Sequence, residues 1–152
     1  MRKLVALLLF LGACRTTTPM SSPASPSGGT TGTTTSEAAV TSFLGAVKAG
    51  DLQAMSLVWG TEKGPASAQM DRAELEKREI IMQCFFNHDQ ARIVSRLPSE
   101  STSEVYVVEL KKGTLTRTPK MTTVRGPQGR WYLADAEIDA VRDFCRNPPG
   151  TR

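Results

Sequence analysis

The chain has 152 residues, which is enough for one domain of ordinary size, and 39% of them are hydrophobic and 22% charged. Its formal charge of +4 comes from 19 basic and 15 acidic residues, and without Arg2 and Lys3 the remaining 17 basic residues nearly balance the acidic ones. The basic residues alternate with acidic ones and form no stripe with aromatic residues, which argues against a nucleic-acid partner. The three cysteines and one histidine have no metal-binding spacing, so we expect neither a metal nor a cofactor.

The N-terminus has the pattern of a secretory signal. Two basic residues are followed by ten apolar ones, LVALLLFLGA, over residues 4–13. A ten-residue helix is about 15 Å long, half of the roughly 30 Å hydrocarbon core of a bilayer. The segment is therefore too short for a permanent span, and we predict a signal peptide over residues 1–13.

The signal ends in LGAC, residues 11–14, which resembles the lipobox of bacterial lipoproteins. The resemblance implies cleavage before Cys14, a diacylglyceryl group on its thiol, and usually a further palmitate-type acyl chain on the new N-terminus. Two or three chains would give a stable membrane anchor. The residue directly after the cysteine is Arg15. By the sorting rule of enteric bacteria, Asp at this position would retain the protein in the inner membrane. Arg15 therefore implies the periplasmic face of the outer membrane. The alternative is an ordinary secretory signal in which Cys14 has no role.

The composition after Cys14 is that of a linker. Residues 15–35 contain eight Thr, four Ser, three Pro and three Gly with a single charge, too little apolar surface to offset the entropy of ordering. We predict a lipidated cysteine and disordered tether over residues 14–35, either bare or O-glycosylated. A folded domain is predicted over residues 36–146, followed by a disordered tail over residues 147–152.

Two helices are predicted at the start of the domain. Over residues 36–49, apolar residues recur at the i, i+3, i+4, i+7 spacing of one helical face. These residues are Val40, Phe43, Leu44 and Val47. Ser36 is a suitable N-cap and Gly50 a suitable C-terminal cap, and Asp51 then caps a second short helix that ends at Gly60.

A third helix is predicted after a loop over residues 61–69. Asp71 and Glu74 have the spacing of a capping box at its start. The second half of this helix is strongly apolar, and we expect it to supply the buried face. The residues expected on that face are Ile80, Ile81, Cys84 and Phe85.

About four antiparallel strands are predicted next, from runs at residues 91–97, 103–112, 113–126 and 129–137. In the second run, alternation places Tyr106, Val108 and Leu110 on one face and Val105 and Val107 on the other. One apolar face would pack on the helices, and the other would meet a second copy, a protein partner or a ligand.

The ends of this region carry further signals. Pro119 interrupts the third strand run, which indicates an edge or a bulge. The GPQG turn at residues 126–129 joins the last two runs as a hairpin. A short helix is predicted to close the domain at residues 138–147.

Helices followed by a meander predict an α+β fold, with N-terminal helices packed on a curved antiparallel sheet in a cone-shaped roll. VTSFLGAVKAGDLQAM, residues 40–55, resembles the opening helix pair of the nuclear transport factor 2-like superfamily, where a phrase F-x-x-A-x-x-x-G-D is common. GRWYLADAEI, residues 129–138, is similar to its last strand. The resemblance extends from Ser36 to about Cys145 and is greatest to small bacterial lipoproteins of unknown function. A cystatin-like roll is the alternative, disfavoured because it has one helix rather than three.

Cys84 and Cys145 remain after the lipidated cysteine is set aside. In an oxidising envelope compartment they would form a disulfide between the third helix and the C-terminal segment. The alternative is that Cys84 is a buried free thiol. The only histidine, His88, is interpreted with Asp89 as capping the third helix rather than as an acid–base pair, because adjacent residues at a helix end do not face each other.

Five residues are candidates for the lining or rim of a pocket: Trp59, Tyr106, Trp131, Tyr132 and Asp135. Ketosteroid isomerases of the same superfamily use a carboxylate and a tyrosine in an apolar cavity, but no motif here matches theirs and we assign no catalytic residue. We expect a lipid-anchored envelope protein whose domain binds a ligand or protein partner, or dimerises through its sheet. The alternative is a small isomerase- or dehydratase-like enzyme that uses the cone cavity.

Overall fold

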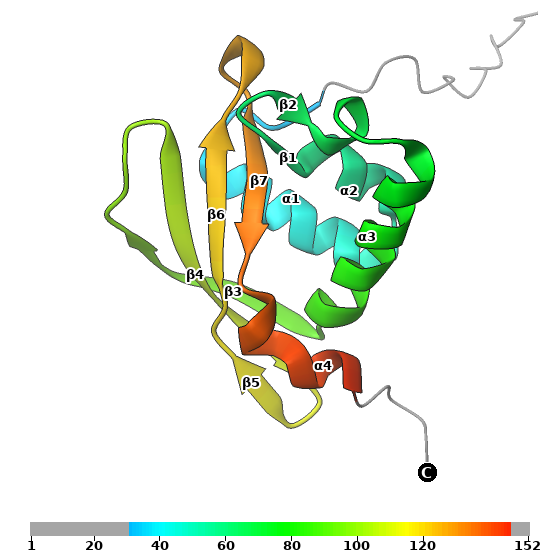
Figure 1. Cartoon of the computed structure of the whole chain (residues 1–152). Helices are drawn as coiled ribbons and strands as arrows, with labels where there is room; N and C mark the ends of the chain where they lie inside the picture. The colour runs from blue at the N-terminus through cyan, green and yellow to red at the C-terminus, as the bar shows by residue number, and fades with distance from the viewer. Residues whose placement is uncertain (1–30, 147–152) are drawn as a thin grey trace, which may run out of the picture.

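Three helices precede an antiparallel sheet and pack against one of its faces. The computed structural model describes residues 31–146, so the predicted signal peptide, Cys14 and the C-terminal tail lie outside the described residues. The helices are α1 (Ser36–Ala49), α2 (Leu52–Val58) and α3 (Arg72–Phe86). All three lie to one side of the sheet (Figure 1), which confirms the predicted α+β arrangement.

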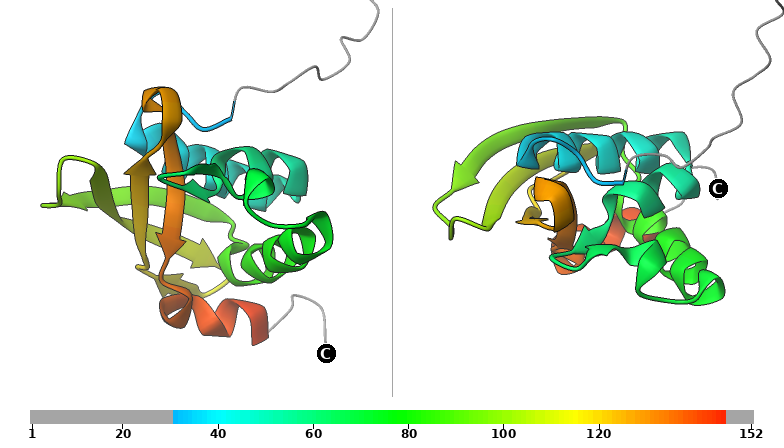
Figure 2. Two further views of the ribbon diagram at one scale, coloured as in Figure 1. Left: turned by 45° about the horizontal axis from the view of Figure 1, so that its top comes forward. Right: turned by 90° about the horizontal axis from the view of Figure 1, so that it is seen from above.

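The sheet has five strands in place of the four predicted. They are β3 (Gln90–Leu97), β4 (Ser103–Lys112), β5 (Leu115–Arg117), β6 (Lys120–Arg125) and β7 (Trp131–Ala136). The order is β3-β4-β6-β7, and β5 pairs with the far end of β4. Pro119 separates β5 from β6, because proline has no amide proton to donate to the ladder. The long strands β3 and β4 curve around α1 (Figure 2).

Two of the three caps predicted for the first two helices are confirmed. All four predicted apolar residues of α1 are buried, and α1 ends at Gly50 with φ +70°, a conformation that glycine adopts at little cost. The Asp51 side chain accepts from the Ala54 amide and caps α2 as predicted. The N-cap of α1 was predicted wrongly, because the Thr35 side chain accepts from the Ala38 amide while Ser36 lies inside the helix and is buried.

The segment expected as a loop between α2 and α3 has local structure. Two-residue strands β1 (Gly60–Thr61) and β2 (Gly64–Pro65) pair with each other, and the 3-10 turn η1 (Ala66–Ala68) follows. Gln69 closes the segment, since its Nε2 donates to the Gly64 carbonyl at 2.7 Å. Trp59 forms a parallel bridge to Leu133, so the start of this segment lies beside β7.

The chain ahead of α1 also lies along β7. Thr33 forms an antiparallel bridge with Trp131, and Arg130 donates to the carbonyls of Thr31 and Gly32. A Cβ on Gly32 would lie 2.8 Å from the Tyr132 ring, so only glycine permits this close approach. Described structure therefore begins ahead of Ser36, within the stretch predicted to be tether.

The buried face of α3 differs from the prediction. Ile80 and Ile81 are 51% and 44% exposed, and Cys84 and Phe85 are half-buried. The buried residues are instead Leu75, Glu79, Met82 and Phe86. Their i, i+4, i+7, i+11 spacing makes a continuous stripe along the whole helix, whereas the predicted face was confined to its C-terminal half.

The core fills the space between the helices and the sheet. Its members from the helices include Val40, Phe43, Met55 and Phe86, and those from the sheet include Val108, Leu110, Met121 and Leu133. The rings of Phe43 and Phe86 meet nearly edge-on, with centroids 6.3 Å apart.

The two faces of β4 differ in burial as the alternation predicted. Tyr106, Val108 and Leu110 are buried, while Val105 and Val107 are half-buried.

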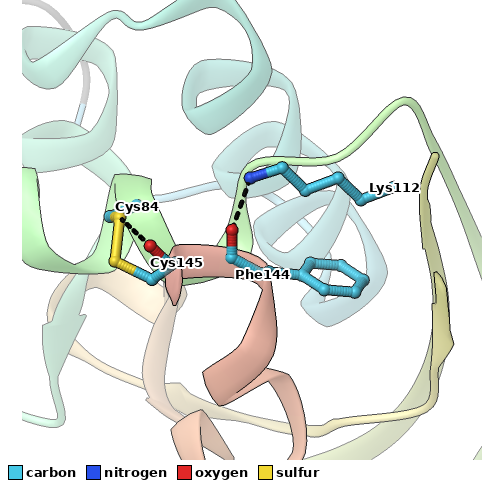
Figure 3. Close-up of a disulfide and its surroundings, with 4 residues drawn as sticks. All are labelled: Cys84, Lys112, Phe144 and Cys145. Carbon is cyan, nitrogen blue, oxygen red and sulfur yellow. Dashed lines mark hydrogen bonds between the residues drawn. A yellow bond between two sulfur atoms is a disulfide. The ribbon is translucent and has the colours of Figure 1, made fainter. Parts of the chain in front are cut away.

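A disulfide ties α3 to the C-terminal helix α4 (Arg142–Arg146). Cys84 and Cys145 are bonded with their Cα atoms 5.0 Å apart, which confirms the predicted pair. Figure 3 shows the bond beside Lys112, whose Nζ donates to the Phe144 carbonyl at 2.7 Å. Arg117 and Asp143 form an ion pair, so α4 is also fastened to the β4–β5 hairpin.

The double variant Cys84→Ser/Cys145→Ser should lose about 4 kcal/mol of unfolding free energy by the loop-entropy relation, given the sequence separation of 61 residues. Denaturant unfolding of the wild-type and variant chains measures this difference. Ser67→Ala is the control, since it changes an exposed side chain outside the disulfide. The wild-type domain should also be lighter by the two thiol hydrogens in a non-reducing mass measurement, and a count of two free thiols in the domain would contradict the bond.

Candidate functional site

The clearest candidate site is a groove between α2 and α3, called here the α2–α3 groove. Its volume is about 470 Å³, within the size range of sites that bind small ligands. It is lined by Leu52, Gln53 and Ser56 of α2 and by Arg72, Leu75, Glu76 and Glu79 of α3. Two apolar and five polar side chains therefore face one hollow on the outside of the helical layer.

Glu79 is the unusual member of this set. The residue is only 3% exposed, and its Oε1 is buried with no hydrogen-bond partner among the described residues. A carboxylate without partners is costly to bury, because it loses its hydrogen bonds to water and gains none within the protein. Native proteins leave few such groups, and each calls for a physical explanation.

The protonation of Glu79 responds to this environment. Burial, and secondly the like charge of Glu76, raise the pKa of Glu79 to about 7. Near neutral pH this carboxyl is therefore balanced between an acid that can donate a hydrogen bond and an anion that can accept one. Carboxyl groups with such shifts are enriched at functional sites.

The other polar groups of the groove differ in exposure from Glu79. Glu76 and Arg72 are exposed, and among the described residues Arg72 takes part in no ion pair. Gln53 and Ser56 are uncharged. The groove thus offers one deep carboxyl group, a second carboxylate nearer to solvent, and a guanidinium at the start of α3.

A second polar cluster lies where α1 meets β4. The Ser36 hydroxyl donates to Glu104 Oε2 at 2.6 Å and lies 2.7 Å from the Tyr106 hydroxyl, which also donates to Glu104 at 2.6 Å. Arg96 completes the cluster with a 3.3 Å hydrogen bond to the same oxygen.

The hydrogen bonds from Ser36 and Tyr106, and then the charge of Arg96, hold the pKa of Glu104 below its usual value. Burial and the neighbouring Glu104 raise the pKa of Tyr106. Each polar side chain here has a partner, which distinguishes the cluster from the α2–α3 groove. It fixes the start of α1 on the sheet.

His88 caps α3, as interpreted from the sequence. The residue is buried, and its Nδ1 lies 2.8 Å from the Phe86 carbonyl at the end of the helix. Because a carbonyl only accepts, Nδ1 carries the proton. Burial lowers the pKa of His88, so the ring is neutral at pH 7. The interpretation was wrong for Asp89, whose carboxylate accepts from the Gly113 amide at 2.7 Å instead of capping the helix.

The structure does not gather the five predicted pocket residues. Tyr106 belongs to the Glu104 cluster, and Trp59 is half-buried beside β7. Trp131 is half-buried at the start of β7, and Asp135 of the same strand is exposed opposite Thr122. Tyr132 is buried against Gly32, with its hydroxyl 3.0 Å from the Thr31 hydroxyl. None of the five lines the α2–α3 groove.

Sequence reasoning missed Glu79, although a signal was present. Glu79 lies four residues after Leu75 and three before Met82, so it occupies a position of the apolar stripe. Residues 31–146 contain no group of three or more His, Cys, Asp or Glu side chains that could hold a metal ion. The chain matches no family model and no curated protein sequence.

Glu79→Gln should change how stability depends on pH. In the wild type the pKa of folded Glu79 is about 7 against an ordinary 4.5, so the contribution of Glu79 to the unfolding free energy should fall by on the order of 3 kcal/mol as pH rises from about 4 to 8. The variant has no such titration, so the two proteins should have similar stability at pH 4 and the variant should be more stable at pH 8. Denaturant unfolding at both pH values measures the difference, and a difference independent of pH would contradict the assignment.

Proposed function

We propose that this chain is a lipid-anchored protein of a bacterial cell envelope, whose small domain binds a ligand or protein partner without catalysing a reaction. The observation that carries the proposal is the N-terminal sequence, in which a short apolar segment runs directly into LGAC with Cys14 at its end. In a Gram-negative cell, Arg15 after the cysteine favours the outer membrane, facing the periplasm.

Two further features support an envelope location. The Thr-, Ser- and Pro-rich stretch after Cys14 suits a tether that keeps a domain clear of lipid headgroups. The disulfide between Cys84 and Cys145 suits an oxidising compartment. Within residues 31–146, no helix has the length and apolar composition needed to cross a bilayer.

We also propose that the domain belongs to the nuclear transport factor 2-like superfamily. The F-x-x-A-x-x-x-G-D phrase at residues 43–51 supports this assignment. So does the order of the elements, three helices followed by an antiparallel meander.

Binding is favoured over catalysis in a cone cavity because the helix-facing side of the sheet is filled. Phe43, Phe86 and Phe144 are fully buried there together with aliphatic side chains of β4, β6 and β7. The α2–α3 groove lies outside this core and supplies a place for a ligand. The opposite face of the sheet, with half-buried Val105 and Val107, is a second surface for a partner or another copy.

One observation favours the second candidate, a small isomerase- or dehydratase-like enzyme. Glu79 is a buried carboxyl with a pKa near 7 beside an open hollow, which suits a general acid or base. The two functions differ in one measurable result. A compound that binds the groove and is recovered chemically unchanged supports a binding protein, whereas turnover that Glu79→Gln abolishes supports an enzyme.

Cys14→Ala tests the anchor. Expressed in a Gram-negative bacterium as the full chain, the wild type should incorporate labelled palmitate and sediment with membranes. The variant should incorporate no label and keep its signal peptide, because the thiol that receives the diacylglyceryl group is missing. Palmitate labelling, membrane fractionation and intact mass measure these outcomes.

Thr16→Ala is the matched control, since it alters a neighbouring residue without touching the thiol, and it should behave as the wild type. Label that persists in the Cys14→Ala protein, or a wild-type chain cleaved but never acylated, would show that LGAC ends an ordinary secretory signal.

A further inference from the structure

Building on the proposed binding function, we propose that the α2–α3 groove binds a primary ammonium or guanidinium group carried on an aliphatic stem, with the Glu79 carboxylate as its acceptor. The proposal names a ligand class for the groove. It rests on the burial of Glu79, its missing partner and the other side chains that line the hollow.

The first step is the hydrogen bonding of Glu79. The residue is 3% exposed, lines the groove and has an Oε1 with no partner among the described residues. An ionised carboxylate only accepts hydrogen bonds, so the group that would satisfy it is a donor. A cationic donor forms the strongest such bond and compensates the buried charge as well.

The second step concerns the charges around Glu79. On its own helix, Glu76 is a second carboxylate, and a cation between the two would relieve their repulsion. Arg72 lies seven residues earlier, about 10 Å along the helix axis, and Glu79 Oε1 receives no hydrogen bond from it. The α2 side chains of the groove are uncharged, and no residue of α1, α4 or the 3-10 turns that pack on α3 lines it.

The third step distinguishes an organic cation from a metal ion. Within residues 31–146 no group of three or more His, Cys, Asp or Glu side chains could hold a metal ion, and the groove has two such side chains, Glu76 and Glu79. Leu52 and Leu75 give the hollow apolar walls, which would contact a methylene chain and not a hydrated ion. An ammonium or guanidinium on such a chain matches both parts of the lining.

Two sources carry this chemistry, a Lys or Arg side chain of a peptide and a free diamine or polyamine. Both present the same cation and the same aliphatic stem to Glu79. They differ in the polar backbone of the peptide, which would lie near the exposed Arg72 and Glu76 at the rim.

Binding should be linked to proton release. Burial leaves Glu79 about half protonated at pH 7, while an alkylammonium stays charged throughout this range. Because only the ionised carboxylate accepts the ligand, affinity should rise about tenfold between pH 6 and pH 8 and level off above.

The experiment is isothermal titration calorimetry on the full chain, purified in a non-ionic detergent. The probes are acetyl-Gly-Lys-Gly-amide and acetyl-Gly-Arg-Gly-amide for the peptide source and 1,5-diaminopentane for the free amine. The same peptide with norleucine in place of lysine keeps the stem and removes the charge. Titrations at pH 6 and 8, in buffers of different ionisation heat, report affinity and the protons released.

We expect saturable binding of at least one cationic probe, with the stronger one identifying the source, and no binding of the norleucine peptide. Glu79→Gln should abolish binding and its pH dependence. Glu62→Gln, which removes an exposed carboxylate in the turn between β1 and β2, is the matched control and should bind as the wild type.

Several results would overturn the inference. The affinity of Glu79→Gln could equal that of the wild type, or the wild-type affinity could be independent of pH. The norleucine peptide could bind as well as the lysine peptide, or calcium or magnesium chloride could bind in place of the amines. Finally, no probe could bind at all. Each is independent of the anchor, because palmitate labelling of Cys14 is measured separately. A chain that is acylated but binds no amine would retain the proposed anchor and lose this ligand class.

Discussion

The rotation of α3 about its own axis is the constraint on which the candidate site depends. Leu75, Met82 and Phe86 face the core along the full length of the helix. On a flank outside this stripe, Cys84 is bonded to Cys145 of α4. The disulfide on one side and the buried stripe on another fix the rotation of the helix about its axis, and that orientation buries Glu79 as a member of the stripe.

The same rotation explains why two isoleucines are exposed while a glutamate is buried. In EIIMQCFF, residues 79–86, apolar residues occupy nearly every angle around the helix, so two faces could have been buried. The face that was predicted, with Ile80 and Ile81, is interrupted one turn earlier by Glu76 and Lys77 and has only Ala73 before them. Only the stripe that contains Leu75 spans the whole helix. Because Glu79 occupies a position of this stripe, packing the stripe against the core also buries Glu79.

Sequence predicted best where local chemistry decides the structure. Helices are capped by Asp51, Asp71 and Gly50 through contacts within a few residues. In β4, strand geometry alone places Tyr106 and Val105 on opposite faces of the sheet. Prediction from the sequence failed where contacts with distant segments of the chain determine the structure. The helical face of α3 and the bridge from Thr33 to Trp131 depend on neighbours far along the chain.

Two energies of similar size act on α3 with opposite signs. The raised pKa of Glu79 corresponds to on the order of 3 kcal/mol of lost stability once pH exceeds about 8. The disulfide contributes about 4 kcal/mol through the loop it closes. Because both enter the same free energy of unfolding, the disulfide is large enough to offset the cost of the buried carboxyl. A small domain held in this way can keep an unpartnered acidic group at the base of a groove, where it is available to a ligand that compensates its charge.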